Sequence, residues 1–295
     1  MMGPQKEELS DYLLTRRMFL GVGVVTSRLR WNSIPSFPSQ YDEEVSREAV
    51  EQQLGIRLIT IRDWYQETGR EFPEDSAQLK DVPREWDADR LNLLLRLSSL
   101  LPPHFRDPHP SGKKLDLILS NTNHCNDTDP GVPPHQINLD YLRFQPQSIR
   151  RALEGLTYEL THTVLPKTVT YLENEFNPNL PPTLKIESPW FPIVEEIMGG
   201  NFPQKAEEMW YKVSERRSTS SGGRRRFYEE LLTGLKRTED PYELISVFSQ
   251  HHLSGRDFMY AMYGEFFTPD QLARLYRFTR DDIFRGVEYA YFPLN

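Results

Sequence analysis

The clearest periodic pattern in the chain is a stripe of aliphatic side chains spaced three or four residues apart. Its members are Ile149, Leu153, Leu156, Leu160 and Val164. At about 100° per residue, these positions fall on one side of a helix. Ser148 is a suitable N-cap, and Pro166 prevents the helix from continuing. The pattern predicts a helix over 148–165, with Tyr158 and His162 on the side opposite the stripe.

Hydrophobic patterning also predicts the elements that surround this helix. The expected helices cover 43–54 and 89–101, and the expected strands cover 56–62, 115–119 and 137–142. Gly55 is suited to ending the first of these helices, and a pair of prolines ends the second. Beyond residue 189 the pattern is mostly helical. The sequence therefore predicts an α+β fold with a helical C-terminal part.

Composition places the chain among globular proteins and limits its partners. Hydrophobic residues make up 38% of the 295 positions and charged residues 26%, which is enough for a full core. The net charge of -8 argues against a nucleic-acid partner, and the arginine-rich segment 216–226 is interpreted as a flexible, solvated loop. No apolar run reaches the ~18 residues that a transmembrane helix needs. Cys125 is the single cysteine, which excludes an internal disulfide and a cysteine-based zinc cluster.

Residues 1–42 are interpreted as a flexible arm that precedes the first predicted helix. Within it, Arg16-Arg17 and the short apolar stretch that follows are similar to a twin-arginine export signal. Arg28 and Arg30 follow that stretch closely, which favours an unstructured arm instead. Export by a twin-arginine-type signal and a cytoplasmic location both stay open.

The segment from Tyr158 to His162 reads Tyr-Glu-Leu-Thr-His and differs by one residue from the zinc-hydrolase signature His-Glu-x-x-His. In that signature, two imidazoles at positions i and i+4 of a helix converge on one ion, and the Glu takes a proton from metal-bound water. Here Glu159 and the second His are present, but Tyr158 stands at the position of the first His. A degenerate signature of this kind indicates a metallopeptidase with an altered ligand or one that has lost its metal.

The order of elements around this motif resembles that of the zincin metallopeptidases, and in particular the anthrax-lethal-factor-like branch. The similarity is one of pattern, and it is carried by a helix ending in Leu-Pro, two strands and the signature helix, over residues 89–165. In this branch the second of those strands lies at the edge of the sheet. The resemblance implies a zincin-like subdomain over 43–188, with a small mixed sheet packed on the signature helix. A mostly helical subdomain would follow over 189–295.

The same resemblance implies a third metal ligand from a later helix, usually a Glu. Glu243 in Pro-Tyr-Glu-Leu-Ile-Ser-Val-Phe is most similar to the segment that carries this ligand, and Glu195 or Glu196 is the alternative. Zinc would then be held by His162, Glu243 and Tyr158, with Glu159 as general base. A phenol has a pKa of ~10, so the Tyr would make a weak ligand, and an oxyanion-stabilising role is its alternative.

Two other donor pairs, His251-His252 and His124-Cys125, are interpreted as a helix end and a surface loop, although one of the first pair could line the same cleft. Three functions remain open. The first is zinc-dependent peptide hydrolysis that tolerates the Tyr. The second is a pseudoprotease that binds a polypeptide through the inherited cleft without cutting it. The third is an unrelated α+β interaction protein. The aromatic C-terminal part is expected to be core, with a peptide groove as the alternative.

Overall fold

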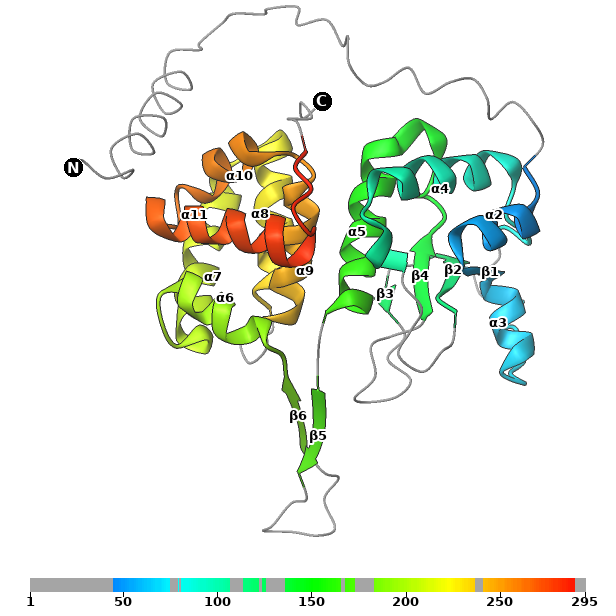
Figure 1. The fold of residues 1–295 in the computed structure, drawn as a ribbon, viewed down its shortest axis with the longest axis horizontal. Helices are drawn as coiled ribbons and strands as arrows, with labels where there is room; N and C mark the ends of the chain where they lie inside the picture. Colours follow the sequence, from blue (N-terminus) through cyan, green and yellow to red (C-terminus); the bar gives the residue numbers. More distant parts are fainter. Residues whose placement is uncertain are drawn as a thin grey trace, which may run out of the picture.

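The computed structural model of the chain describes a helical protein with one small β-sheet and a separate β-hairpin (Figure 1). The described residues are 45–74, 79, 81–106, 114–121, 124–125, 136–165, 168–172, 183–236 and 241–289. The predicted arm over 1–42, with Arg16-Arg17, lies outside these residues, so export stays a prediction. Among the described helices, none is long and apolar enough to cross a membrane.

The N-terminal part builds the sheet and its covering helices. Its helices are α2 (Arg47–Leu54), α3 (Ile61–Glu67), α4 (Ala88–Leu100) and α5 (Ile149–Val164), with short 3-10 turns η1 (Pro103–Arg106) and η2 (Pro146–Ser148). Its strands are β1 (Arg57–Thr60), β2 (Asp116–Ser120), β3 (His124–Cys125) and β4 (Gln136–Asp140). Gly55 adopts a positive φ of 68° at the end of α2, a conformation that side-chain-bearing residues rarely adopt.

The sheet has the order β1-β2-β4-β3, in which the first three strands are parallel and β3 runs antiparallel at the edge. Leu117 pairs with Leu58 on one side and with Ile137 on the other, which fixes the register of the parallel strands. All five residues of β2 are buried, as expected for the centre of a sheet covered on both faces. The expectation that the strand over 137–142 forms the edge is wrong, because the two-residue β3 pairs with its outer side.

The C-terminal part is a bundle of helices that packs on α5. Its elements are α6 (Trp190–Met198), α7 (Phe202–Thr219), α8 (Gly222–Gly234), α9 (Tyr242–His252), α10 (Arg256–Tyr263), α11 (Pro269–Arg277) and the π-helical η3 (Phe278–Ile283). Helix α5 contacts the sheet at β3 and β4 and lies along α9, so it joins the two parts (Figure 1). The predicted α+β fold with a mostly helical C-terminal part is confirmed, whereas the boundary at residue 188 stays a prediction.

Several local predictions need correction. The strand expected over 56–62 ends at Thr60, because Thr60 and Asp63 form a capping box that starts α3: the Thr60 hydroxyl accepts from the Asp63 N–H, and the Asp63 carboxylate accepts from the Thr60 N–H. Ile149 is 41% exposed and does not belong to the buried stripe of α5. The loop expected within 216–226 is reduced to a short turn, because α7 continues to Thr219 and α8 begins at Gly222.

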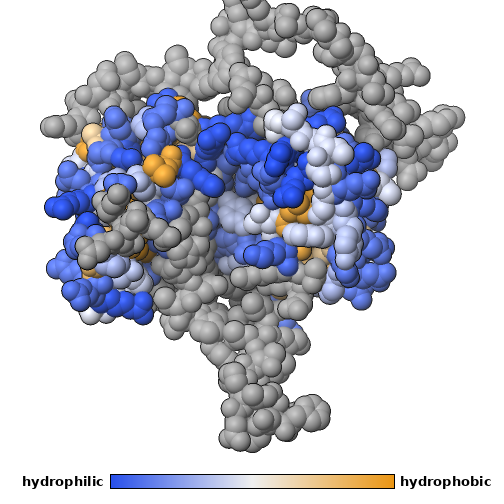
Figure 2. Space-filling model, turned by 180° about the vertical axis from the view of Figure 1, so that it is seen from behind, coloured by the Kyte–Doolittle hydropathy of each residue, from blue (hydrophilic) through white to orange (hydrophobic). Residues whose placement is uncertain are grey.

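A β-hairpin that sequence patterning did not predict follows α5. Its strands are β5 (Thr168–Leu172) and β6 (Thr183–Glu187), which pair in antiparallel orientation from Thr168 opposite Glu187 to Leu172 opposite Thr183. In Figure 1 the hairpin projects away from both parts of the protein. The surface of the described residues is largely hydrophilic when viewed from behind, with small hydrophobic patches (Figure 2), as the high content of charged residues leads one to expect.

Candidate functional site

The three side chains predicted as metal ligands, Tyr158, His162 and Glu243, meet between α5 and α9. Tyr158 and His162 lie one helical turn apart on α5, which places both on the side that faces α9. The Tyr158 hydroxyl donates a hydrogen bond to Oε2 of Glu243, which lies in the first turn of α9. Nε2 of His162 is 3.7 Å from the same carboxylate oxygen. Residues that are 85 positions apart in the sequence are thus in direct contact.

Packing and helix geometry both position this group. The aromatic ring of Tyr242 lies against His162, with ring centroids 4.3 Å apart, and its hydroxyl is 3.4 Å from the His162 carbonyl oxygen. The side chain of His162 is 4% exposed and that of Glu243 is 20% exposed. A carboxylate in the first turn of a helix is favoured by the partial positive charge of the helix N-terminus. The first turn of α9 therefore suits Glu243 as the acceptor of the Tyr158 hydrogen bond.

A serine on α9 also contacts His162. A serine hydroxyl beside a histidine can act as a nucleophile in hydrolases. Ser246 Oγ is 3.3 Å from Nε2 of His162. In a Ser–His–acid triad the hydroxyl and the acid contact opposite nitrogens of the imidazole. Here Ser246 and Glu243 both approach Nε2, and Ser246 is 1% exposed. The arrangement therefore does not match a serine hydrolase. Sequence analysis missed Ser246, although its spacing of three residues from Glu243 placed it on the same side of a helix.

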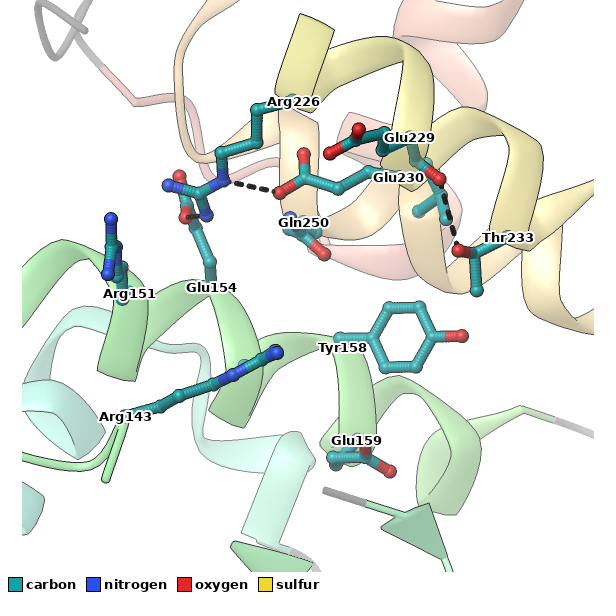
Figure 3. Close-up of a pocket in the computed structure, with 12 residues that line it drawn as sticks. Arg143, Arg151, Glu154, Tyr158, Glu159, Arg226, Glu229, Glu230, Thr233 and Gln250 are labelled. Carbon is teal, nitrogen blue, oxygen red and sulfur yellow. Dashed lines mark hydrogen bonds and ion pairs between the residues drawn. The ribbon is translucent and has the colours of Figure 1, made fainter. Parts of the chain in front are cut away.

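A cleft of about 490 Å³ opens beside Tyr158, between α5 on one wall and α8 and α9 on the other. Tyr158 and Glu159 line the first wall, and Thr233 and Gln250 line the second (Figure 3). Glu159 is only 2% exposed and lies close below Tyr158 in this view. Arg143, from the turn after β4, extends across the cleft toward these two residues. Most of the side chains that line the cleft are therefore charged or polar.

A series of ion pairs beside the cleft links α5 to α8 and α9. Arg150 and Arg226 both pair with the carboxylate of Glu154, and the contact of Arg150 Nε measures 2.6 Å. Arg226 also contacts Glu230 at 2.7 Å, and Glu230 is 2.9 Å from Nε2 of His251. These residues lie on three different helices, α5, α8 and α9. These ion pairs hold α8 and α9 against α5. Because the charges are buried or half-buried, removal of one residue leaves the charge of its partner uncompensated.

The surroundings of Glu230 and Arg226 favour the charged forms of these two side chains. Burial alone would raise the pKa of Glu230, but the hydrogen bond and charge of His251 and the charge of Arg226 outweigh it and lower the pKa to about 2. Burial would likewise lower the pKa of Arg226, and the charges of Glu154 and Glu230 raise it instead. Tyr263, whose hydroxyl is 2.7 Å from Nδ1 of His251, has a pKa well above its usual value because it is buried beside Glu230.

The other predicted donors have different contacts. Glu195 accepts a hydrogen bond from the backbone of Phe202, and Glu196 pairs with Arg274, so Glu243 is the one of the three that contacts Tyr158. His252 makes its hydrogen bond to the Val287 carbonyl oxygen, 2.9 Å away. The adjacent His251 contacts Glu230 instead. The backbone of His124-Cys125 forms β3, in place of the loop that was expected.

The residues around Tyr158 do not form a good catalytic zinc site. Such sites normally combine three protein ligands drawn from His, Glu, Asp and Cys with one water. Within the described ranges, no group of three or more such residues is arranged to hold a metal ion. His162 and Glu243 supply two donors of these types, and the third group at this point is a phenol that donates its proton to the carboxylate. A phenol with a pKa of ~10 must lose this proton before it can bind a metal.

The chain matches no protein-family profile, no curated protein and no solved structure.

Proposed function

We propose that this protein is a non-catalytic relative of the zincin metallopeptidases, which binds a polypeptide in the cleft beside Tyr158. The observation that carries the proposal is the hydrogen bond from Tyr158 to Glu243. In a zincin-like site the residues at positions 158, 162 and 243 would surround a metal ion. Here the phenol reaches the carboxylate directly, and the space between α5 and α9 is occupied by contacts among the protein's own side chains.

The size and lining of the cleft support the proposal that the protein binds a polypeptide there. Its volume of about 490 Å³ accommodates several side chains of an extended peptide, and it lies beside the Tyr158 group without being filled by it. Both walls offer hydrogen-bonding side chains, including Gln250 and Thr233. A peptide bound there would be positioned by polar contacts with these side chains.

Zinc-dependent peptide hydrolysis is the second candidate, and one observation favours it. Glu159 keeps the residue type of the general base in the zinc-hydrolase signature, and it lines the cleft although it is 2% exposed. Catalysis of this kind would require that the Tyr158 hydroxyl give up its contact with Glu243 to a metal ion. The donor set described above argues against that exchange at neutral pH.

Binding and hydrolysis can be separated with one set of peptides. A displayed library of random dodecapeptides, selected on the immobilised protein, should yield binders that remain intact by mass spectrometry in the presence of added zinc. Thr233 is an exposed residue on the cleft wall, so Thr233→Trp should fill the cleft and abolish binding. Ser218→Trp is the control, because this exposed residue of α7 lies outside the cleft.

Two results would overturn the proposal. Cleavage of the selected peptides by wild-type protein, lost in Glu159→Gln, would establish the hydrolase. Selected peptides whose binding is unchanged by Thr233→Trp would show that the cleft is not the binding site.

A further inference from the structure

We infer that Arg143 and Arg151, which both line the cleft, bind carboxylates there, so that the bound polypeptide carries acidic residues at this position. The inference rests on the proposed polypeptide-binding function and adds the chemical class of the partner. It follows from which charges of the cleft are already compensated and which are not.

Cationic partners surround the acidic residues Glu154, Glu229 and Glu230 of the cleft. Glu154 is paired with Arg150 and Arg226, and Glu230 is paired with Arg226 and His251. Glu229 is paired with Arg225 at 3.1 Å. The fourth, Glu159, is 2% exposed and lies deep in the cleft. A ligand that enters the cleft therefore meets little uncompensated negative charge at its mouth.

The two remaining arginines of the cleft are differently placed. Arg151, in the first turn of α5, is exposed and has no hydrogen-bond or ion-pair partner for its side chain in the described part of the chain. Arg143 has a side chain that is 67% exposed, and its ion pair is with Asp140, three residues before it, at 3.3 Å. In Figure 3 the Arg143 guanidinium points into the cleft and Arg151 stands on the same wall.

The chemistry of these two groups selects an anion. A guanidinium presents its N–H donors in a planar fork that matches a carboxylate, and the resulting charge-assisted hydrogen bonds are stronger than neutral ones. Because both arginines face solvent, their salt-dependent attraction would also guide an acidic peptide toward the cleft. Neutralising the acidic residue of the peptide should weaken binding about tenfold, as expected for the loss of a hydrogen bond between charged groups.

The test is a selection of random dodecapeptides on four proteins: wild type, the Arg143→Glu/Arg151→Glu double variant, the Arg143→Gln/Arg151→Gln double variant and Arg217→Glu. Arg217 is exposed on α7, outside the cleft, and provides a control with the same change of charge at one position. Peptides selected on wild type should be enriched in Asp and Glu, and the same enrichment should persist on Arg217→Glu. The Gln pair should lose the enrichment, and the Glu pair should reverse it toward Lys and Arg.

The outcomes distinguish this inference from the function on which it rests. If wild-type peptides are neutral or basic but Thr233→Trp still blocks them, the arginine pair is wrong and cleft binding stands. If no selected peptide responds to Thr233→Trp, the proposed function fails and this inference fails with it. An enrichment in acidic residues that survives both double variants overturns the inference as well, because the acidic residue would then contact another part of the protein.

Discussion

Replacement of Glu230 by Gln should remove a large part of the resistance of this protein to unfolding by acid. Gln keeps the shape of the side chain but removes the charge that faces Arg226 and His251. The change removes the negative charge that Arg226 and His251 contact at the point where α8 and α9 meet, and among the described residues it leaves Arg226 with Glu154 as its one carboxylate partner. We therefore expect a loss of unfolding free energy at neutral pH and an altered dependence of that free energy on pH.

The magnitude follows from the pKa of Glu230, which is lowered from 4.5 to about 2 in the folded protein. At about 1.4 kcal/mol per pH unit, this difference corresponds to about 3 kcal/mol of stability. Because the pKa is lower in the folded state, the contribution is complete above pH 4.5. It is lost progressively as the pH falls from 4.5 toward 2, since protonation then favours the unfolded chain.

Urea unfolding, followed by circular dichroism, measures this effect. At pH 7 we expect Glu230→Gln to lower the unfolding free energy by about 2–3 kcal/mol, and the difference from wild type should shrink between pH 4.5 and pH 2.5. Glu229→Gln is the matched control on the next residue, because Glu229 forms a solvent-exposed pair with Arg225. It should change stability by less than about 0.5 kcal/mol. Equal stability of the two variants at pH 7, or a difference that is constant with pH, would refute the reasoning.

Three further changes test local packing, helix capping and the Tyr158 hydrogen bond. Gly234→Ala should lower the unfolding free energy by about 1–3 kcal/mol in the same urea assay. The reason is that the added Cβ would lie 3.0 Å from the Leu244 Cα and 3.0 Å from the Val247 Cγ2. A variant as stable as wild type would show that α8 and α9 shift apart without cost. Thr268→Ala should cost about 1 kcal/mol by removing the capping box of α11, and Thr268→Ser should retain most of that stability. Tyr158→Phe should cost about 1–3 kcal/mol because it leaves the Glu243 carboxylate without its donor, and an unchanged urea midpoint would contradict that hydrogen bond.

The sequence predicted those elements whose hydrophobic periodicity or capping residues lie within a short segment. The buried stripe of Leu153, Leu156 and Leu160 identified α5 and the side on which Tyr158 lies. The capping box of Thr268 and Gln271, with Pro269 at the first position of the helix, is a signal of the same local kind at the start of α11. The corresponding box at Thr60 was equally local but was hidden by the alternation of apolar residues in the preceding strand.

Contacts between distant parts of the chain could not be predicted in the same way. The pairs Arg150–Glu154 and Arg226–Glu230 are visible in the sequence as residues four apart on a helix, but the bridge from Arg226 to Glu154 depends on how α8 packs against α5. Strand β3 is only two residues long, so its place at the sheet edge has no periodic signal. The approach of Glu243 to Tyr158 was expected only through the resemblance to zincins, and its role as a metal ligand stays a prediction.

The central claim is that Tyr158 converts a metal site into a metal-free contact. The most direct test is the zinc content, by inductively coupled plasma mass spectrometry, of wild-type protein and Tyr158→His after incubation with zinc and gel filtration without chelator. With His at position 158, the site would contain two imidazoles one turn apart and the Glu243 carboxylate, a donor set typical of zinc. We predict that Tyr158→His retains about one zinc ion per chain, that a further His162→Ala change removes it, and that wild type retains none. Stoichiometric zinc in wild type, lost on His162→Ala, would contradict the account, and absence of zinc from both proteins would contradict the zincin-like site itself.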